Sequence, residues 1–201
     1  MMNGRRGGSF AGKVLMVLGI LLLPVIIVGG CAISGYNKAI ALSEDVDNRW
    51  AQVESQLQRR FDLIPNLVET VKGYAGHEKE VFSDIAEARA AYTGAGSRAE
   101  KVKAANAFES ALSRLLVIRE AYPELKANQN FMSLQAQLEG TENRIAVERK
   151  RYNDAVKRLN TYCRKFFGRV FAGWAGVEKA EYFEVAEEAK AVPKVDFGTG
   201  K

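Results

Sequence analysis

The run of residues from Val14 to Ile33 contains no charged side chain and is almost wholly apolar, whereas the chain from Tyr36 onward is rich in charged residues. A helix needs roughly 20 apolar residues to cross a hydrocarbon core of about 30 Å, and this run supplies them. We therefore predict a single transmembrane helix over residues 14–33, preceded by a basic arm over residues 1–13.

Two processing signals are alternatives to a permanent anchor. Basic residues followed by an apolar run also describe a cleaved secretory signal peptide. A lipoprotein signal is a more specific form of this alternative, because Cys31 comes just after the two small residues Gly29 and Gly30. Cys31 is thus a candidate lipidation site. The mass of the intact protein in the membrane fraction separates these cases, since cleavage removes about thirty residues.

Charge on the two sides of the apolar run predicts an orientation. Arg5, Arg6 and Lys13 precede the run, whereas Lys38 and Arg49 on the other side are diluted by acidic residues. The positive-inside rule then places the N-terminus in the cytoplasm and the C-terminal domain outside the bacterial inner membrane.

The charge of the remaining chain argues against nucleic-acid binding. The first 33 residues hold three of the 29 basic residues and none of the 24 acidic ones, which leaves 26 basic against 24 acidic residues, a net charge of +2. A nearly neutral domain has no electrostatic footprint for nucleic acid. Cys31 lies at the edge of the predicted span and Cys163 in a predicted helix, so we expect no intrachain disulfide.

Apolar residues recur three and four apart through most of the chain after residue 45, which is typical of amphipathic helices. The longest pattern predicts a helix of roughly 40 residues, with its apolar positions at Phe131, Leu134, Leu138, Ile145, Tyr152, Ala155, Leu159, Tyr162 and Phe166. Shorter patterns cover residues 46–57, 64–88 and 102–116. The predicted fold class is all-α, with a transmembrane helix followed by an antiparallel four-helix bundle of coiled-coil character over residues 34–166.

Three breaks separate the predicted helices. Asp62 can cap a helix whose first turn contains Pro65, which predicts a tight turn near Phe61. The small, polar segment 93–97 predicts a loop, with Ser97 capping the next helix and Glu100 completing a capping box. The third break is expected at Pro123, because the residue before a proline avoids the helical region.

An apolar cluster follows the long helix and is too short to span a bilayer. It contains the candidate interaction surface of Phe166, Phe167, Val170, Phe171 and Trp174. Residues 167–201 are expected to pack on the end of the bundle, with the tail around residues 192–197 along a helical groove. The cluster could instead dock on the membrane surface or bind a partner.

The sequence contains no recognisable catalytic, metal or cofactor motif. His77-Glu78 could begin a zinc-protease motif, but Val81 occupies the position of the second histidine and the chain has one histidine. Residues 198–201 resemble a phosphate loop only superficially, because no strand precedes them. We predict no cofactor, no metal and no enzymatic activity; a cryptic hydrolase would need a site that the sequence does not reveal.

Polar residues inside the apolar pattern are candidates for setting the register of the bundle. Glu148 occupies a core-type position, and Thr141 and Asn143 lie on or beside the same seam. With Asn153 and Asn160, they could pair across the bundle with Arg59, Arg60 or Asn66, because a buried polar group in a helical seam fixes partner choice. The alternative is that Glu148 reaches out to water.

Several blocks of this sequence resemble the LemA family. They comprise the segments DVDNRWAQV (45–53), QLQRRFDLIPNLVETVKGYA (56–75), AYPELKAN (121–128), GTENRI (140–145) and PKVDF (193–197). Blocks of this length are far more specific than a short motif, and the resemblance extends from about residue 36 to residue 197.

The resemblance implies a membrane-anchored helical bundle without an established biochemical activity. Family members are often encoded near a membrane protease of the HtpX type or a TPM-domain protein, which are therefore candidate partners. The function we expect is a noncatalytic scaffold or adaptor of the bacterial cell envelope that binds membrane proteins or copies of itself. The alternative is a lipid-binding or membrane-remodelling module, with the aromatic cluster at the membrane surface.

Overall fold

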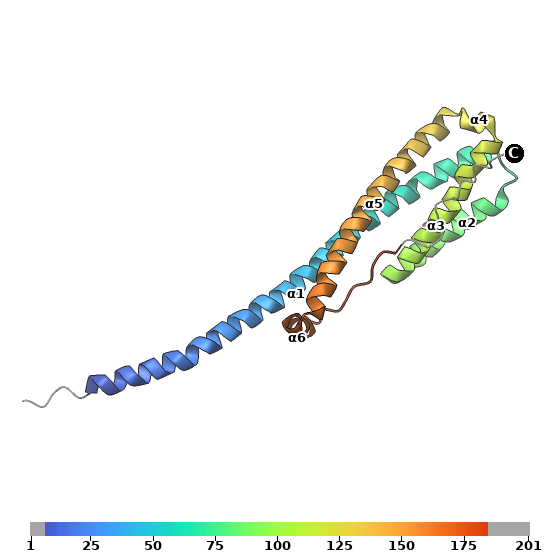
Figure 1. Ribbon diagram of the computed structural model, residues 1–201. Helices are drawn as coiled ribbons and strands as arrows, with labels where there is room; N and C mark the ends of the chain where they lie inside the picture. Colours follow the sequence, from blue (N-terminus) through green and yellow to red (C-terminus); the bar gives the residue numbers. More distant parts are fainter. Residues whose placement is uncertain (1–6, 185–201) are drawn as a thin grey trace, which may run out of the picture. The chain divides into compact units, whose positions relative to one another are not determined.

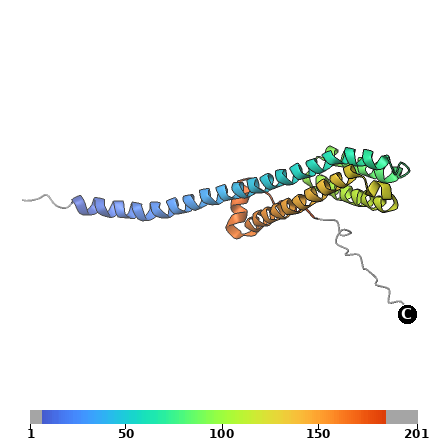
Figure 2. The ribbon, with the colours of Figure 1, turned by 90° about the horizontal axis from the view of Figure 1, so that it is seen from above.

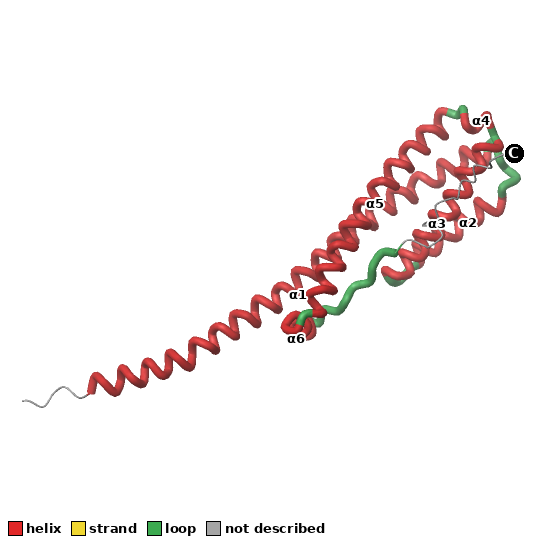
Figure 3. Tube along the Cα trace, viewed as in Figure 1, coloured by secondary structure: helices red, strands yellow, loops and turns green. Residues whose placement is uncertain are grey.

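The computed structural model describes residues 7–184 of the 201-residue chain, with side chains described from residue 12 onward. Every regular element of this described part is a helix, and Figure 3 shows these helices joined by loops. The predicted all-α class is therefore confirmed for the described residues. The expected tail around residues 192–197 lies outside them.

Helix α1 (Gly7–Lys72) runs unbroken from the apolar segment into the charged part of the chain. The predicted tight turn near Phe61, with Asp62 as a helix cap, is wrong. Buried apolar residues keep the helical spacing on both sides of Pro65, at Leu57, Phe61, Ile64, Leu67 and Val71. A proline inside a helix costs about 3 kcal/mol. Burying each of these side chains stabilises the fold by about 1.5–3 kcal/mol, so their combined burial outweighs the proline.

The chain turns instead at residues 73–78, between α1 and α2 (Lys79–Gly94). Ala75 is buried in this turn, where its N–H donates to the Val71 carbonyl at 2.8 Å. The helix predicted over residues 64–88 is therefore divided between two helices. His77 is exposed within the turn and belongs to neither helix.

Helix α3 (Arg98–Ile118) begins as the sequence predicts. Ser97 is its N-cap, and the Glu100 N–H donates to the Ser97 hydroxyl oxygen at 3.2 Å. In return, the Glu100 carboxylate accepts the Ser97 N–H at 3.2 Å. The capping box satisfies backbone groups that the first helical turn leaves unpaired, which confirms both the loop before Ser97 and the start of the helix.

The third predicted break is also confirmed. A single 3₁₀ turn, η1 (Arg119–Ala121), follows α3, and the short helix α4 (Pro123–Lys126) begins at the proline. Helix α5 (Gln129–Arg164) then extends over 36 residues, within two residues of the predicted bounds at each end. The Asn128 side-chain oxygen accepts the Phe131 N–H at 3.1 Å and so caps the start of α5.

After α5 the chain forms α6 (Phe166–Trp174) and then an extended strap over residues 177–184. Gly176 has φ +64°, a left-handed conformation that glycine adopts without steric cost and that ends α6. Two asparagines of α5 hold the strap. The amide of Asn160 exchanges two hydrogen bonds with the backbone of Ala180, at 2.9 and 3.0 Å, and that of Asn153 does the same with Phe183, at 3.0 and 2.9 Å.

The chain divides into two compact units. Among the described residues, unit 1 comprises 7–46 and 157–180, and unit 2 comprises 47–156 and 181–184. Helices α1 and α5 each contribute one segment to either unit. Within unit 2, α2 and α3 lie side by side in both Figure 1 and Figure 2.

The core of unit 2 is built from all four long helices. The ring of Phe61 on α1 lies 4.5 Å, centroid to centroid, from Tyr92 on α2 and from Phe108 on α3. Further along α1, the Trp50 ring meets Tyr152 on α5 at 5.4 Å. These aromatic contacts join segments that are remote in the sequence, and such pairs stabilise packing beyond the area that they bury.

Candidate membrane interface

The apolar segment of α1 keeps its side chains uncovered. This helix contains an 18-residue window with a mean hydropathy of 2.8, none of which is buried within the protein. Leucine, isoleucine and valine side chains along residues 14–33 are all exposed. Apolar surface of this extent is unfavourable in water and marks a surface that meets lipid or another protein.

Helix α6 belongs to the same unit as this apolar segment, and glycine makes its position possible. A Cβ at Gly168 would lie 2.1 Å from the Tyr162 carbonyl oxygen, so α6 is packed directly against the end of α5. Gly35 of α1 has a similar role, because a Cβ there would lie 2.0 Å from the Phe171 ring. Only glycine allows so close an approach of α1 and α6.

The aromatic side chains of α6 are largely exposed. Phe166 is 80% exposed, Phe167 68% and Trp174 65%, whereas Phe171 is half-buried against Gly35. Figure 2 shows that α6 lies crosswise to α1, with both segments in unit 1. If the apolar segment of α1 crosses a bilayer, a helix crosswise to it lies along the membrane surface, where aromatic side chains are enriched.

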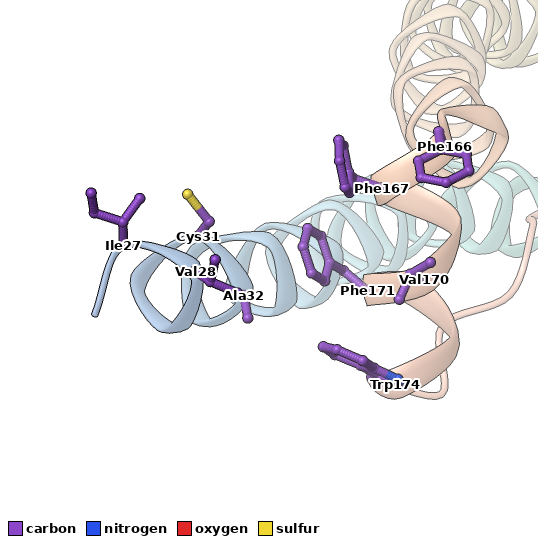
Figure 4. A pocket seen from close by; sticks show the side chains of 9 residues that line it. All are labelled: Ile27, Val28, Cys31, Ala32, Phe166, Phe167, Val170, Phe171 and Trp174. Atoms are coloured by element: carbon purple, nitrogen blue, oxygen red, sulfur yellow. The ribbon is translucent and has the colours of Figure 1, made fainter. Parts of the chain in front are cut away.

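The two apolar surfaces meet in one groove of about 550 Å³, which we call the apolar groove. Figure 4 shows Phe171 and Trp174 extending from α6 toward α1. The groove is lined by Ile27, Val28, Cys31 and Ala32 of α1 and by Phe166, Phe167, Val170, Phe171 and Trp174 of α6. All five members of the predicted interaction surface, and Cys31, thus lie together.

Tyr162 ties this region to the end of α5. Its hydroxyl donates to the Gly35 carbonyl oxygen of α1 at 2.7 Å. Burial raises the pKa of the Tyr162 phenol, so the hydroxyl keeps its proton and remains a donor. Burial also raises the pKa of the neighbouring Cys163 thiol, which is unfavourable for a reactive thiolate. Cys31 and Cys163 are both free.

The polar residues predicted to set the register do not pair across the helices. Thr141 is buried, but its hydroxyl donates to the Leu138 carbonyl of its own helix at 2.8 Å. Asn143 is exposed. The Glu148 side chain is only 15% exposed and pairs with Arg151, one turn further along α5, at 2.6 Å. Among the described residues, none of the three forms a hydrogen bond or ion pair with Arg59, Arg60 or Asn66, and their role in setting the register stays a prediction.

The interior ion pairs join Arg60, which the sequence analysis named as a candidate partner, to two carboxylates that it did not name. Arg60 is 6% exposed, and its guanidinium pairs with Glu109 of α3 and, at 2.6 Å, with Glu142 of α5. Glu142 sits directly beside the Thr141 position that periodicity selects. Periodicity alone could not show which of two adjacent residues faces a partner on another helix.

Within the described residues no group of three or more histidine, cysteine or acidic side chains is arranged to hold a metal ion. The site that does stand out is a surface, which combines the exposed apolar segment of α1 with the aromatic face of α6.

Comparison with known proteins identifies the family of the chain. The family profile of LemA matches residues 49–197, which is most of the chain. The chain belongs to the LemA family. The match includes α6 and its aromatic residues but begins after the apolar segment of α1, so the family assignment rests on the helical body and not on that segment.

Relatives of this LemA family member include magnetosome proteins. It is 27% identical over 206 residues to magnetosome proteins MamQ 1 and MamQ 2 of Paramagnetospirillum magneticum, covering 90% of this chain and 75% of theirs. It is 25% identical over 198 residues to MamQ of Magnetospirillum gryphiswaldense, covering 86% of this chain and 73% of that protein. All three alignments cover more of this chain than the family match does. The chain is thus a membrane-associated helical protein of this family.

Proposed function

We propose that this protein is a noncatalytic scaffold or adaptor of the bacterial cell envelope, anchored by a single span over residues 14–33. The proposal is supported by one observation above the others. The exposed aromatic face of α6 shares a groove with the exposed apolar segment of α1. A protein that needed only a tether would not have to place a second apolar helix beside the end of the span.

The helical body of the scaffold is an antiparallel four-helix bundle built from α1, α2, α3 and α5. Its support is the shared core of unit 2, to which each of the four helices contributes buried side chains. The loops before α2 and α3 are short, as expected for antiparallel neighbours. A rigid body of this kind offers several helix faces for binding other proteins.

In this proposal α6 lies at the membrane surface and its aromatic side chains enter the lipid interface. The test reconstitutes the full chain in nanodiscs with lipids brominated near the headgroup or deep in the acyl chain. Trp174 emission should be quenched more strongly by the shallow bromines, because an interfacial helix lies only 5–10 Å deep, roughly at the acyl boundary.

The Trp174→Phe variant isolates this signal, since it leaves the buried Trp50 as the remaining tryptophan. The difference between wild type and variant is the contribution of Trp174. If that difference is insensitive to both bromolipids, Trp174 is in water and α6 is not an interfacial helix.

The orientation we propose has the N-terminus in the cytoplasm and the bundle outside, following the basic residues that precede the span. A cysteine introduced by Lys103→Cys, at an exposed position of α3, reports the side of the bundle. It should react with a membrane-impermeant maleimide in spheroplasts before permeabilisation. Labelling only after permeabilisation would reverse the orientation.

The proposed partners are copies of the chain itself and membrane proteins, among them a protease of the HtpX type or a TPM-domain protein. Proteins tethered to one membrane meet at high effective concentration, so even weak contacts between helix faces can hold them together. Cross-linking in native membranes should trap dimers or larger species. Finding monomers alone would contradict self-association.

A second candidate function is membrane remodelling, which the continuity of the apolar groove with the apolar segment of α1 favours. A helix that inserts on one side of a bilayer expands that leaflet and can curve it. Electron microscopy of proteoliposomes should then show smaller or tubulated vesicles with wild type and not with a Phe167→Ser, Trp174→Ser double variant. Identical vesicles would exclude remodelling and leave the scaffold proposal intact.

A further inference from the structure

A second groove in unit 1 is basic. It has a volume of about 340 Å³ and its lining comes from α1, from the last turns of α5 and from the residue that follows α5. Its lining consists of Lys38, Leu42, Lys157, Arg158, Thr161, Tyr162 and Lys165. We call it the basic groove. Four of its seven lining residues are cationic, and none of the seven is acidic.

Three of these four cationic side chains have no ion-pair partner among the residues that the structure describes. Arg158 pairs with Asp45 at 2.6 Å. The Lys38 ammonium lies 5.9 Å from the centre of the Tyr162 ring and forms no salt bridge with a described residue. Lys157 and Lys165 are exposed and likewise have no carboxylate partner in the described part of the chain. Three cations in one groove thus lack an anionic partner within residues 7–184, and like charges that line one groove favour an anionic ligand.

The basic groove and the apolar groove meet at Tyr162 and Gly35. Tyr162 lines the basic groove, and its hydroxyl binds the Gly35 carbonyl. On its other side Gly35 contacts the ring of Phe171, which lines the apolar groove. The contact between Tyr162 and Gly35 therefore separates the apolar groove from the basic groove.

One face of α1 likewise passes from apolar residues to a basic residue. Val28, Cys31, Gly35, Lys38 and Leu42 follow one another three or four residues apart, so they share a face of the helix. With a rise of 1.5 Å per residue, Lys38 lies about 10 Å beyond Cys31 along the axis. If residues 14–33 span the hydrocarbon core, Cys31 lies at its edge and Lys38 lies at the depth of lipid headgroups.

We propose that the two grooves together bind an anionic phospholipid, with the headgroup phosphate in the basic groove and an acyl chain along the apolar groove. Lysine side chains at the end of a span hold their apolar stems against the protein and direct their ammonium groups to the headgroups. A soluble anion would use only the basic groove. The inference rests on the proposed membrane span, but it does not depend on a scaffold role or on any protein partner.

The test measures lipid preference of the full chain in detergent micelles by native mass spectrometry. The delipidated protein is titrated with an equimolar mixture of phosphatidylglycerol and phosphatidylcholine. Wild type should bind phosphatidylglycerol in preference to phosphatidylcholine. In the Lys157→Gln, Lys165→Gln double variant that preference should fall roughly tenfold or more, because a lysine beside an anionic surface contributes about fivefold.

The matched control is Lys103→Gln, Lys150→Gln, which removes the same charge from two exposed positions of unit 2. It should keep the wild-type preference. An equal loss in the control would show that overall charge selects the lipid, and an unchanged preference in the Lys157, Lys165 variant would exclude the basic groove. Both results overturn the proposal, as would displacement of phosphatidylglycerol by soluble glycerol phosphate at equal concentration.

Folding and the interfacial position of α6 are monitored separately. The two substituted lysines are exposed and unpaired within the described residues, so circular dichroism should be unchanged. Trp174 quenching by bromolipids tests the placement of α6, and the lipid preference tests the basic groove. Quenching of Trp174 without a lipid preference would refute the lipid site and leave the interfacial position of α6 standing. A lipid preference without quenching would refute the interfacial position of α6 and leave the lipid site standing.

Discussion

The two units of this protein draw on the same two long helices but use their aromatic side chains in opposite ways. In unit 2, Phe61 and Phe108 are buried, and their rings meet edge to face with centroids 4.5 Å apart. In unit 1, Phe166 and Phe167 lie on the outside of α6. A buried aromatic ring stabilises the fold, whereas an exposed ring in water does not. The buried rings of unit 2 therefore contribute to stability, whereas the exposed rings of unit 1 do not.

Charged side chains follow the same division. The buried Arg60 of unit 2 is matched by two carboxylates from other helices. Three cations of the basic groove in unit 1 have no such match among the described residues. A cation that is paired internally fixes the packing of helices, and one that is left unpaired beside a groove is available to a ligand.

The largest expected difference between the units is in the cost of removing an aromatic ring. Phe108→Ala should lower the free energy of unfolding by about 3–5 kcal/mol, because it empties a fully buried site. Phe167→Ala should change it by less than about 0.5 kcal/mol, as for other exposed positions. Urea unfolding of the full chain in detergent, followed by circular dichroism, measures both. Equal costs would abolish the distinction between the units.

Tyr92 in unit 2 and Tyr162 in unit 1 allow the stability of the two units to be compared at alkaline pH. Burial, assisted by the nearby Glu54 carboxylate, raises the pKa of Tyr92 in unit 2 to about 12. No described residue bonds its hydroxyl. Between pH 10 and 12 the unfolded chain has already lost this proton and the folded chain has not. Stability should therefore fall by about 2–3 kcal/mol across this window.

The variant Tyr92→Phe should remove that fall and leave stability at pH 7 nearly unchanged, because the lost hydroxyl had no partner. Tyr162→Phe in unit 1 should instead lower stability at pH 7, since its hydroxyl donates to the Gly35 carbonyl. Unfolding at pH 7, 10 and 12 measures both variants. An identical pH profile for wild type and Tyr92→Phe would show that Tyr92 ionises normally.

Arg60 provides the matching test for buried charge. Arg60→Met should cost about 2 kcal/mol, less than for a fully buried ion pair, because Glu109 and Glu142 are 39% and 41% exposed and can be hydrated. Adding Glu109→Gln and Glu142→Gln should recover most of the loss by removing the uncompensated charges. Thermal unfolding of the single and triple variants measures this recovery. A triple variant that is less stable than Arg60→Met would show that the uncompensated carboxylates do not cause the loss of stability.

The smallest expected effect concerns the feature that the units share. Asn153 in unit 2 and Asn160 in unit 1 hold the strap by the same pair of amide bonds. Asn160→Ala should cost about 1 kcal/mol and speed tryptic cleavage after Lys179, with Asn153→Ala similar in stability. Asn143→Ala, at an exposed position of α5, is the control. Cleavage at the wild-type rate in Asn160→Ala would show that the strap is held by other contacts.

Much of the fold could be predicted because its signals are local. The capping box at Ser97, the break at Pro123 and the length of α5 each depend on residues within one or two helical turns. The turn predicted near Phe61 failed for the opposite reason. Pro65 is a local signal for a helix start, but burial of apolar residues on both sides of it outweighs that preference.

The candidate site was predictable only in part. Composition indicated that the residues from Phe166 to Trp174 form an apolar cluster, and the cluster is exposed as one face of α6. Nothing in its sequence indicated its neighbours on α1, or that Asn153 and Asn160 hold the strap. Such contacts depend on which residue of a helical turn faces which other segment, and periodicity resolves this only to within about one residue.

The amino-acid sequence by itself determined the apolar segment, the capped start of α3 and the length of α5, because these follow from interactions between residues a few positions apart. The tertiary structure alone decided that Gly35 would meet Tyr162, 127 positions later, and that apolar and basic grooves would adjoin there. The physical reason is distance along the chain. A contact between remote segments depends on the packing of everything between them, and no local preference specifies it.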